Sequence, residues 1–160
     1  MGEAAQAASV GPMAAVAGAI AEALGEEMNK YCKEIIIENG GDIYIKSSEK
    51  RIIGIFASKS RFSCQIGLEI TGNETPLGLC TSSGTIGSSI SLGKADAVVI
   101  KANTASLADA AATATANIIK TSQDLKPAIE FANKIAGITG VVAIKGNLLA
   151  AWGNIKIIKI

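Results

Sequence analysis

The stretch "ADAVVIKANTASLADAAATATANIIK", residues 95–120, combines a strand pattern with a helix pattern and contains candidate ligand-binding side chains. Its first part, residues 95–102, is nearly continuous in apolar side chains, and this predicts a strand buried on both faces. Asn103 or Thr104 follows as a helix cap, and the alanine-rich remainder predicts a helix from about Ala105 to Lys120. The sequence of this stretch therefore predicts a buried strand that leads into a capped helix.

The helix over residues 105–120 has two different faces. Asp109 and Thr113 are four residues apart, so their carboxylate and hydroxyl lie on the same face. The opposite face is expected to contact the core and carries Leu107, Ala111, Ala114 and Ile118. A hard cation such as Mg²⁺ prefers oxygen ligands of the kind that Asp109 and Thr113 offer. The residues alone leave two interpretations open, a metal-binding face and a solvated polar face.

The rest of the chain predicts helices and strands on both sides of this stretch. A helix starting at Pro12 has small residues over most of its surface, so it can pack closely on more than one side, and its apolar residues recur at helical spacing: Met13, Val16, Ala17, Ile20, Ala23, Leu24 and Met28. Strand-like runs occupy residues 33–46 (a hairpin or a bulged strand around Gly40-Gly41), 51–57, 64–70 and 75–80. A helix over 124–134 is followed by strands over 141–146, 148–152 and 154–160, expected as a meander. This order predicts a single α+β domain over residues 1–160, with a mostly antiparallel sheet flanked by helices.

Composition excludes several classes of function. Fifteen basic residues balance fourteen acidic ones, which gives no electrostatic reason to expect nucleic acid or an anionic membrane as a partner. The chain has no His, so Ser–His and Cys–His nucleophile pairs and imidazole zinc sites are excluded. Cys32, Cys64 and Cys80 are too far apart for a CxxC site, and an odd count without a secretion signal predicts a reducing cytoplasm. The apolar run from Val10 is broken at Glu22, too short to span a bilayer, and predicts a soluble protein.

Two clusters that contain glycine have both a structural and a ligand-binding interpretation. Asn39-Gly40-Gly41-Asp42 is typical of a hairpin turn, which is the favoured interpretation. Its glycines would also let a ligand approach the backbone while Asp42 orients it. The second cluster, "LCTSSGT" over residues 79–85, joins a strand end to hydroxyl side chains and a glycine: Thr81, Ser82, Ser83, Gly84 and Thr85. These residues form either a nest for a phosphate oxygen or a capped turn.

Two further side chains stand beside these clusters. The Cys80 thiol has a lowered pKa if it is exposed to the N–H groups of the turn. The favoured interpretation is a small buried hydrophobe at the end of a strand. Lys94, just before the predicted strand, either neutralises a ligand phosphate or is solvated, as a lone lysine in a turn usually is.

Six segments, in this order, resemble the ApbE-like family, the flavin transferases that move FMN from FAD onto a protein Thr. The resemblance is closer to the small, His-poor branch of that family. The segments are "GPMAAVAGAIAE", "ENGGDI", "LCTSSGT", "GKADAVV", "ADAAATA" and "AAWGNIKIIKI", and they span essentially all 160 residues. The resemblance implies an ApbE-like fold, which is related to the T-fold.

The resemblance also implies a set of site residues. In the transferases the Gly/Ala helix and the ADAxxTA segment hold Mg²⁺, which transfers the metal role to Asp109, Thr113 and a carbonyl at Ala14 or Ala15. The Gly-Gly-Asp segment and the Thr-Ser-Gly turn line the FAD cleft. That role transfers to Gly41, Asp42, Thr81, Ser82, Ser83 and Gly84, and Lys94 joins them as a candidate for the phosphates. The implied cofactors are therefore Mg²⁺ and FAD or FMN.

The sequence departs from the transferases in one motif and in its start. The transferases carry a His-containing motif ending in Asp-Pro, whereas residues 87–96 read "GSSISLGKAD". Asp96 and Cys80 remain as catalytic candidates. Relatives have a further N-terminal segment that covers the flavin, and this chain is expected to lack it. Apolar surface around the helix from Pro12 would then be uncovered, so we expect a homo-oligomer, most simply a two-fold dimer.

Three functional hypotheses follow. The first is a Mg²⁺-dependent enzyme that transfers FMN or hydrolyses the FAD pyrophosphate, a reaction that needs no His when a metal polarises the bond. The second is a non-catalytic module that binds a flavin or another nucleotide. The third is a protein that handles sulfur as a persulfide on Cys80. The residues rank the first two about equally and the third below them.

Overall fold

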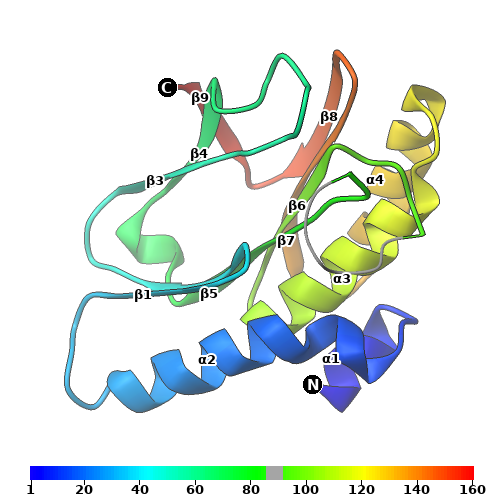
Figure 1. The fold of residues 1–160 in the computed structure, drawn as a ribbon. Coiled ribbons are helices and arrows are strands. Elements are labelled where there is room, and N and C mark those ends of the chain that lie inside the picture. Colours follow the sequence, from blue (N-terminus) through cyan, green and yellow to red (C-terminus); the bar gives the residue numbers. More distant parts are fainter. Residues whose placement is uncertain (86–91) are drawn as a thin grey trace.

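The helices of this chain cover one face of a six-stranded sheet, and a second, three-stranded sheet covers the other face (Figure 1). The computed structural model describes residues 1–85 and 92–160. The helical segments are α1 (Gly2–Ala7), η1 (Pro12–Ala15), α2 (Val16–Met28), η2 (Gly72–Glu74), α3 (Ala105–Ile118), η3 (Ser122–Asp124) and α4 (Leu125–Asn133). The strands are β1 (Ile35–Asn39), β2 (Asp42–Lys46), β3 (Arg51–Gly54), β4 (Ile66–Ile70), β5 (Leu77–Ser82), β6 (Ala97–Ala102), β7 (Ile138–Lys145), β8 (Leu148–Gly153) and β9 (Lys156–Lys159).

All neighbouring strands pair antiparallel, in the orders β1-β2-β5-β6-β7-β8 and β3-β4-β9. Two hydrophobic cores result. One lies between the helices and the larger sheet, and the other lies between the two sheets. The predicted class, an α+β fold with mostly antiparallel sheet flanked by helices, is confirmed. No helix in the described part of the chain has the length and apolar character that crossing a bilayer requires.

The central strand and helix form as the sequence predicts. Every residue of β6 is buried, because β6 lies inside the larger sheet and both of its faces are covered. Thr104 caps α3, its side chain accepting a hydrogen bond from the Leu107 N–H. The helix is buried far beyond the expected stripe, since α1, α2 and α4 pack around it while its other side contacts β5 and β6. Asp109 is itself buried, so the interpretation of its face as solvated is wrong.

α2 packs closely against α3 through its small residues, as its composition allows. Of the apolar residues at helical spacing, Met13 is 79% exposed, and Ile20 and Leu24 are also exposed. The buried residues of α2 are Gly18, Ala21 and Gly25. A Cβ at Gly18 would lie 2.3 Å from the carbonyl oxygen of Ala105, so the lack of a side chain is what lets α2 lie so close to α3. Close backbone approach decided the packing face, and a pattern of large side chains does not detect it.

The predicted meander at the end of the chain is wrong in its last strand. β7 and β8 form the expected hairpin around Gly146-Asn147. The chain then turns away at Gly153, whose φ is +88°, and β9 pairs with β4 of the smaller sheet. Because β9 joins the smaller sheet, Ile155 and Ile157 pack against the core between the two sheets, and this burial stabilises the arrangement.

At the other end of the larger sheet, the "ENGGD" segment forms a hairpin and not a bulged strand. Gly40 and Gly41 have positive φ values of +64° and +99°, and β1 pairs with β2 directly on either side of them. In the next strand pair Asp42 lies opposite Cys80 of β5. The turn therefore brings the Asp42 carboxyl beside the segment that begins "LCTSSGT".

Candidate functional site

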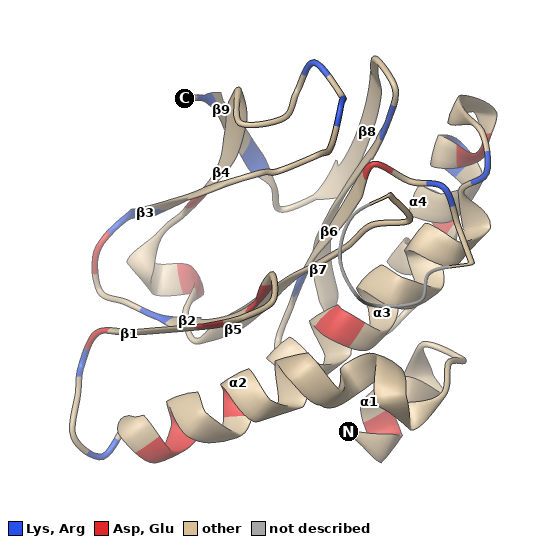
Figure 2. Ribbon diagram, viewed as in Figure 1, with Lys and Arg blue, Asp and Glu red and all other residues tan. Residues whose placement is uncertain are grey.

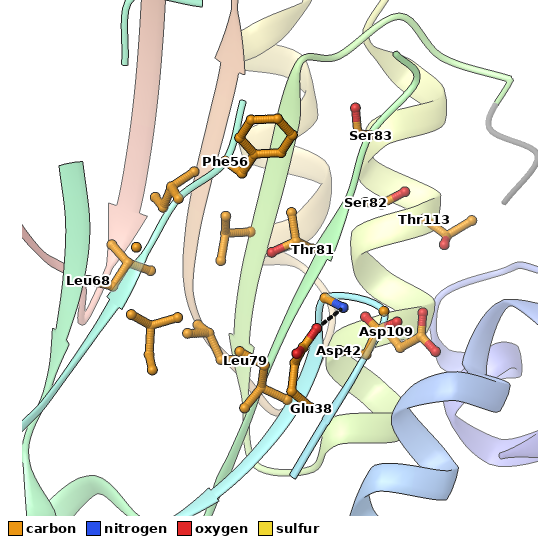
Figure 3. A pocket seen from close by; sticks show the side chains of 17 residues that line it. Glu38, Asp42, Phe56, Leu68, Leu79, Thr81, Ser82, Ser83, Asp109 and Thr113 are labelled. Carbon is orange, nitrogen blue, oxygen red and sulfur yellow. Dashed lines mark hydrogen bonds between the residues drawn. The ribbon is translucent and has the colours of Figure 1, made fainter. Parts of the chain in front are cut away.

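A cleft of about 410 Å³ lies between the two sheets and reaches the side of α3. It is lined by the β1–β2 hairpin, the end of β3 with the residues after it, β4, β5, β6 and α3 (Figure 3). The cleft gathers most of the residues that the sequence and its resemblance indicate: Gly41, Asp42, Thr81, Ser82, Ser83, Asp109 and Thr113. They come from three distant segments, and the fold brings them to one place.

The sequence did not indicate the rest of the lining. One wall is apolar and is formed by Ile43, Ile53, Ile55, Phe56, Leu68, Leu79 and Val99. Phe56 is exposed at the edge of this wall although it is large and apolar. Glu38 of β1 also lines the cleft, and its carboxylate accepts a hydrogen bond of 2.9 Å from the Gly41 N–H. These residues carry no local motif, because only the stacking of the smaller sheet over the larger one makes this wall.

Asp109 lies at the start of α2. Its Oδ2 accepts a 2.9 Å hydrogen bond from the N–H of Gly18. The first N–H groups of a helix have no partner within the helix, and here a carboxylate on α3 satisfies one of them. Burial raises the pKa of Asp109, and the N–H groups of Gly18 and Ala17 offset part of that rise. Asp109 therefore has a structural role in joining α2 to α3, whatever else it binds.

Asp42 is 8% exposed and lies close to Asp109 (Figure 3). Burial raises the pKa of Asp42 to about 7, and the negative charge of Asp109 adds to the rise. Its Oδ1 is buried without a hydrogen-bond partner among the described residues. A buried carboxylate oxygen normally has a partner, and two neighbouring carboxyls do not both ionise readily without positive charge. This corner of the cleft is suited to a proton or a cation.

The pKa of Asp42 predicts that the metal-free protein loses stability as the pH rises from about 4 to about 7. The pKa is about 7 in the folded chain and 3.8 in the unfolded chain, so the folded state binds the proton more tightly over this interval. The stabilisation is complete below the lower value and is lost as the pH passes the upper one. One group contributes at most about 1.4 kcal/mol per pH unit.

Urea unfolding across this pH range measures the effect, with Asp42→Asn as the variant that cannot titrate. The free energy of unfolding of Asp42→Asn is expected to depend less on pH than that of the wild type. Parallel pH profiles for the two proteins would show that the Asp42 pKa is not raised.

The donors of the hydroxyl turn bond to protein groups, within the turn and on the segment before β6. The Ser83 hydroxyl donates to the carbonyl oxygen of Asp96 over 2.9 Å, and the Gly84 N–H donates to the carbonyl oxygen of Ala95 over 2.9 Å. The Thr85 N–H donates to the Ser83 Oγ over 3.1 Å. These donors are not free for an anion. The geometry favours the capped turn over the phosphate nest for residues 83–85, while Ser82 keeps its place in the cleft wall. Residues 86–91 lie outside the described part.

Several of the predicted site residues, Cys80 among them, are not part of the cleft lining. Asp96 is buried, and its Oδ2 accepts a 2.6 Å hydrogen bond from the Gly146 N–H in the β7–β8 turn. Gly84 and Lys94 are exposed outside the cleft. Ala15 is buried at the junction of η1 and α2, near the helix start that Asp109 caps. Asp96 therefore has a hydrogen-bond partner in the β7–β8 turn, and Ala15 lies near the end of α2 to which Asp109 bonds.

Cys80 is fully buried under the cleft, and its thiol donates to the carbonyl oxygen of Ala105. Burial raises the pKa of this thiol well above its ordinary value, and the charges of Asp42 and Asp109 raise it further. The favoured interpretation of Cys80 as a small buried hydrophobe fits this environment. A thiol that stays protonated is a poor nucleophile.

Iodoacetamide is expected to modify Cys32 and Cys64, which are exposed, and to leave Cys80 unmodified in the folded protein. Mass spectrometry of the native and the unfolded chain checks this. With Cys32 and Cys64 replaced by Ser, the native protein should remain unlabelled from neutral pH to about 8.5, the ordinary pKa of a free thiol. Labelling of Cys80 within that range would reopen the sulfur hypothesis.

The fold, an α+β architecture of antiparallel sheets flanked by helices, is that of ApbE-like proteins. The apo crystal structure of the flavinyl transferase ApbE from Pseudomonas stutzeri superposes with a TM-score of 0.59 over 88% of this chain and 47% of that chain. The two are 16% identical, so the likeness concerns the fold. A family model described as "AbpE bacteria" matches residues 1–145, and the chain belongs to this family. The resemblance to ApbE-like proteins is thereby confirmed.

Two UPF0280 proteins are among the relatives of this chain. A UPF0280 protein of Methanococcus aeolicus is 41% identical over 160 residues, covering 97% of this chain and 64% of that protein. A UPF0280 protein of Methanocella arvoryzae is 43% identical over 157 residues, covering 95% of this chain and 62% of that protein. The chain thus spans a little less than two thirds of the length of these relatives.

Proposed function

We propose that the cleft binds a flavin nucleotide together with Mg²⁺. The observation that carries this proposal is the pair of buried carboxyls, Asp42 and Asp109, with an unpartnered oxygen on Asp42. Such a corner gains stability from a bound cation. A neighbouring apolar wall suits a flat aromatic ring. The apo flavinyl transferase of the same fold supports the choice of a flavin.

The donor set fits Mg²⁺ as a partly protein-bound ion. Mg²⁺ usually keeps several waters and takes one or two carboxylates plus phosphate oxygens from its substrate. Asp109, Asp42 and the Thr113 hydroxyl supply such a set, with a backbone carbonyl near Ala15 as a further candidate. Within residues 1–85 and 92–160, no group of three or more His, Cys, Asp or Glu side chains could hold a metal. This arrangement suits a metal that is shared with its ligand.

The charges of the cleft make the cation necessary for a phosphate ligand. The described lining contains Glu38, Asp42 and Asp109 and no Lys or Arg (Figure 3). A pyrophosphate would meet only negative charge there, and like charges at close range repel strongly. Bound Mg²⁺ would neutralise this charge and polarise the phosphate oxygens. Thr81 and Ser82 line the neighbouring wall and would donate hydrogen bonds to the ligand.

The same geometry supports binding of the nucleotide more than rapid transfer of FMN. The chain has no His, and Asp96 is occupied in the β7–β8 turn. General acid–base catalysis typically contributes about 10²–10⁴-fold. We propose that the protein holds the flavin nucleotide and that any attack on its pyrophosphate is slow. The burial of Cys80 argues against the persulfide alternative.

Equilibrium dialysis against FAD, with and without Mg²⁺, tests the binding. Retention of flavin is expected with Mg²⁺ and not with EDTA. Chromatography of the same mixtures tests the chemistry, since hydrolysis by water releases FMN and AMP in equal amounts. Rapid release of AMP would make the protein an enzyme, and failure to retain FAD or FMN in the presence of Mg²⁺ would contradict the proposal.

A further inference from the structure

Four strands lie at the edges of the two sheets, and β8 differs from the other three. β1 contains Glu38, β3 contains Arg51, and β9 contains Lys156 and Lys159. Charged side chains on an edge strand hinder pairing with another chain. β8 reads "LLAAWG" and has no charged residue and no proline. In the part of the chain that the structure describes, no strand pairs with the outer side of β8 (Figure 1).

We propose that β8 pairs antiparallel with β8 of a second copy of this chain and joins two six-stranded sheets into one. The alternation of hydrogen bonds along β8 defines how the two copies would meet. The Asn154 N–H donates to the Thr139 carbonyl of β7 over 2.7 Å. In an antiparallel pair every second residue bonds to the same neighbour. Leu148, Ala150 and Trp152 therefore bond toward β7, which leaves the backbone groups of Leu149 and Ala151 directed outward.

A two-fold axis at Ala150 satisfies these outward groups. Leu149 of one copy then exchanges hydrogen bonds with Ala151 of the other. On the same face, Leu148 of one copy lies directly opposite Trp152 of the other in a non-hydrogen-bonded pair, where side chains come closest. Leu148 is 55% exposed and Trp152 is 37% exposed, so both have apolar surface to bury. The strand is complementary to itself in backbone and in side chains.

Charge favours β8 over the exposed apolar face of α2 as the self-association surface. Ile20 and Leu24 are exposed on α2, but Glu26 and Glu27 are exposed on the same helix (Figure 2). Two copies that met through α2 would bring these carboxylates together. β8 brings no charges together, and a closed two-fold dimer is the commonest oligomer.

The chain has a single tryptophan, Trp152, so its fluorescence reports on the proposed interface directly. We expect light scattering after size exclusion to show a dimer that dissociates on dilution. The emission of Trp152 should shift to longer wavelength over the same concentrations, as the indole becomes hydrated. A monomer at every concentration would overturn the proposal.

Variants with opposite charges at Leu148 and Trp152 test the register of the proposed β8–β8 pairing. The variant L148K/W152K and the variant L148E/W152E each place like charges opposite each other, and each is expected to weaken the dimer at least about 100-fold. Mixing the two variants should restore a dimer, because each Lys then faces a Glu. This rescue cannot come from a variant that has failed to fold.

Ile36→Lys provides the matched control, because Ile36 is similarly exposed on β1, the other edge of the same sheet. The dimer of the Ile36→Lys variant should dissociate over the same concentration range as the wild-type dimer. Equal weakening by Ile36→Lys, or no heterodimer when the two charge variants are mixed, would contradict pairing through β8. Neither result depends on flavin or Mg²⁺, so this test is independent of the proposed ligand.

Discussion

Replacing Asp109 by Asn is expected to lower the affinity for Mg²⁺, and with it the Mg²⁺-dependent retention of FAD, by about 100-fold or more. Removing a group that merely supports a metal ligand typically costs 10–100-fold, and Asp109 is proposed as a ligand itself. The Asn side chain keeps the shape of Asp and still offers an oxygen to the Gly18 N–H. The substitution therefore removes the charge while it leaves the cap of α2 in place. Isothermal calorimetry with Mg²⁺ alone measures the direct effect.

Asp96→Asn is the matched control for this experiment. Asp96 is as buried as Asp109, and its carboxylate also accepts from a backbone N–H, that of Gly146. It lies outside the cleft lining. The control is expected to bind Mg²⁺ and FAD as the wild type does. If Asp109→Asn bound Mg²⁺ like the wild type while remaining folded, Asp109 would be only the cap of α2 and the proposed metal site would be wrong.

Replacing Gly18 by Ala is expected to destabilise the protein by about 2–3 kcal/mol, although alanine is the better helix former. The new Cβ would lie 2.3 Å from the Ala105 carbonyl oxygen and 2.8 Å from the Cβ of Asp109. Both contacts are with the body of α3, which has no flexible end there that moves aside. α2 must move away from α3, and the Gly18–Asp109 hydrogen bond must lengthen.

Gly11→Ala is the control for the second experiment. Gly11 precedes η1 with φ −68° and ψ 152°, values that alanine adopts readily, and a Cβ there would meet nothing within 4 Å. Its effect should stay within about 0.5 kcal/mol. Chemical denaturation measures both variants. Gly18→Ala should also weaken Mg²⁺ binding, because it displaces Asp109. A Gly18→Ala protein as stable as Gly11→Ala would show that α2 and α3 do not pack this closely.

Much of the fold was predictable because local patterns determine it. The β1–β2 turn, the Thr104 cap and the double-sided burial of β6 each depend on residues within a few positions of one another. The packing of α2 was not predictable in this way. The helix could turn either its large or its small residues inward, and the backbone of α3 opposite Gly18 decided between them. The exchange of β9 into the smaller sheet likewise depended on a partner, β4, far away in the chain.

Some residues of the candidate site were likewise predictable from the sequence, and others were not. Asp109 and Thr113 were identified from their spacing on one helix and from the resemblance, and Asp42 from its glycine turn. Glu38 and Phe56 carried no signal, because their place in the cleft arises from the stacking of one sheet on the other. Asp96 was a catalytic candidate because of its position in the sequence. In the structure its carboxylate accepts a hydrogen bond from the Gly146 N–H of the β7–β8 turn.

The sequence by itself determined the kinds and order of most helices and strands, the absence of imidazole chemistry, and the residues available to bind a cation. Only the tertiary structure decided that Asp42 and Asp109 meet in a buried corner with raised pKa values. Desolvation and charge repulsion depend on distance in space, and the groups that act on these carboxyls come from distant segments: Asp109 of α3 acts on Asp42 of β2, and the Gly18 N–H of α2 acts on Asp109. The identity of a side chain is set by the sequence, but its pKa is set by what the fold places around it.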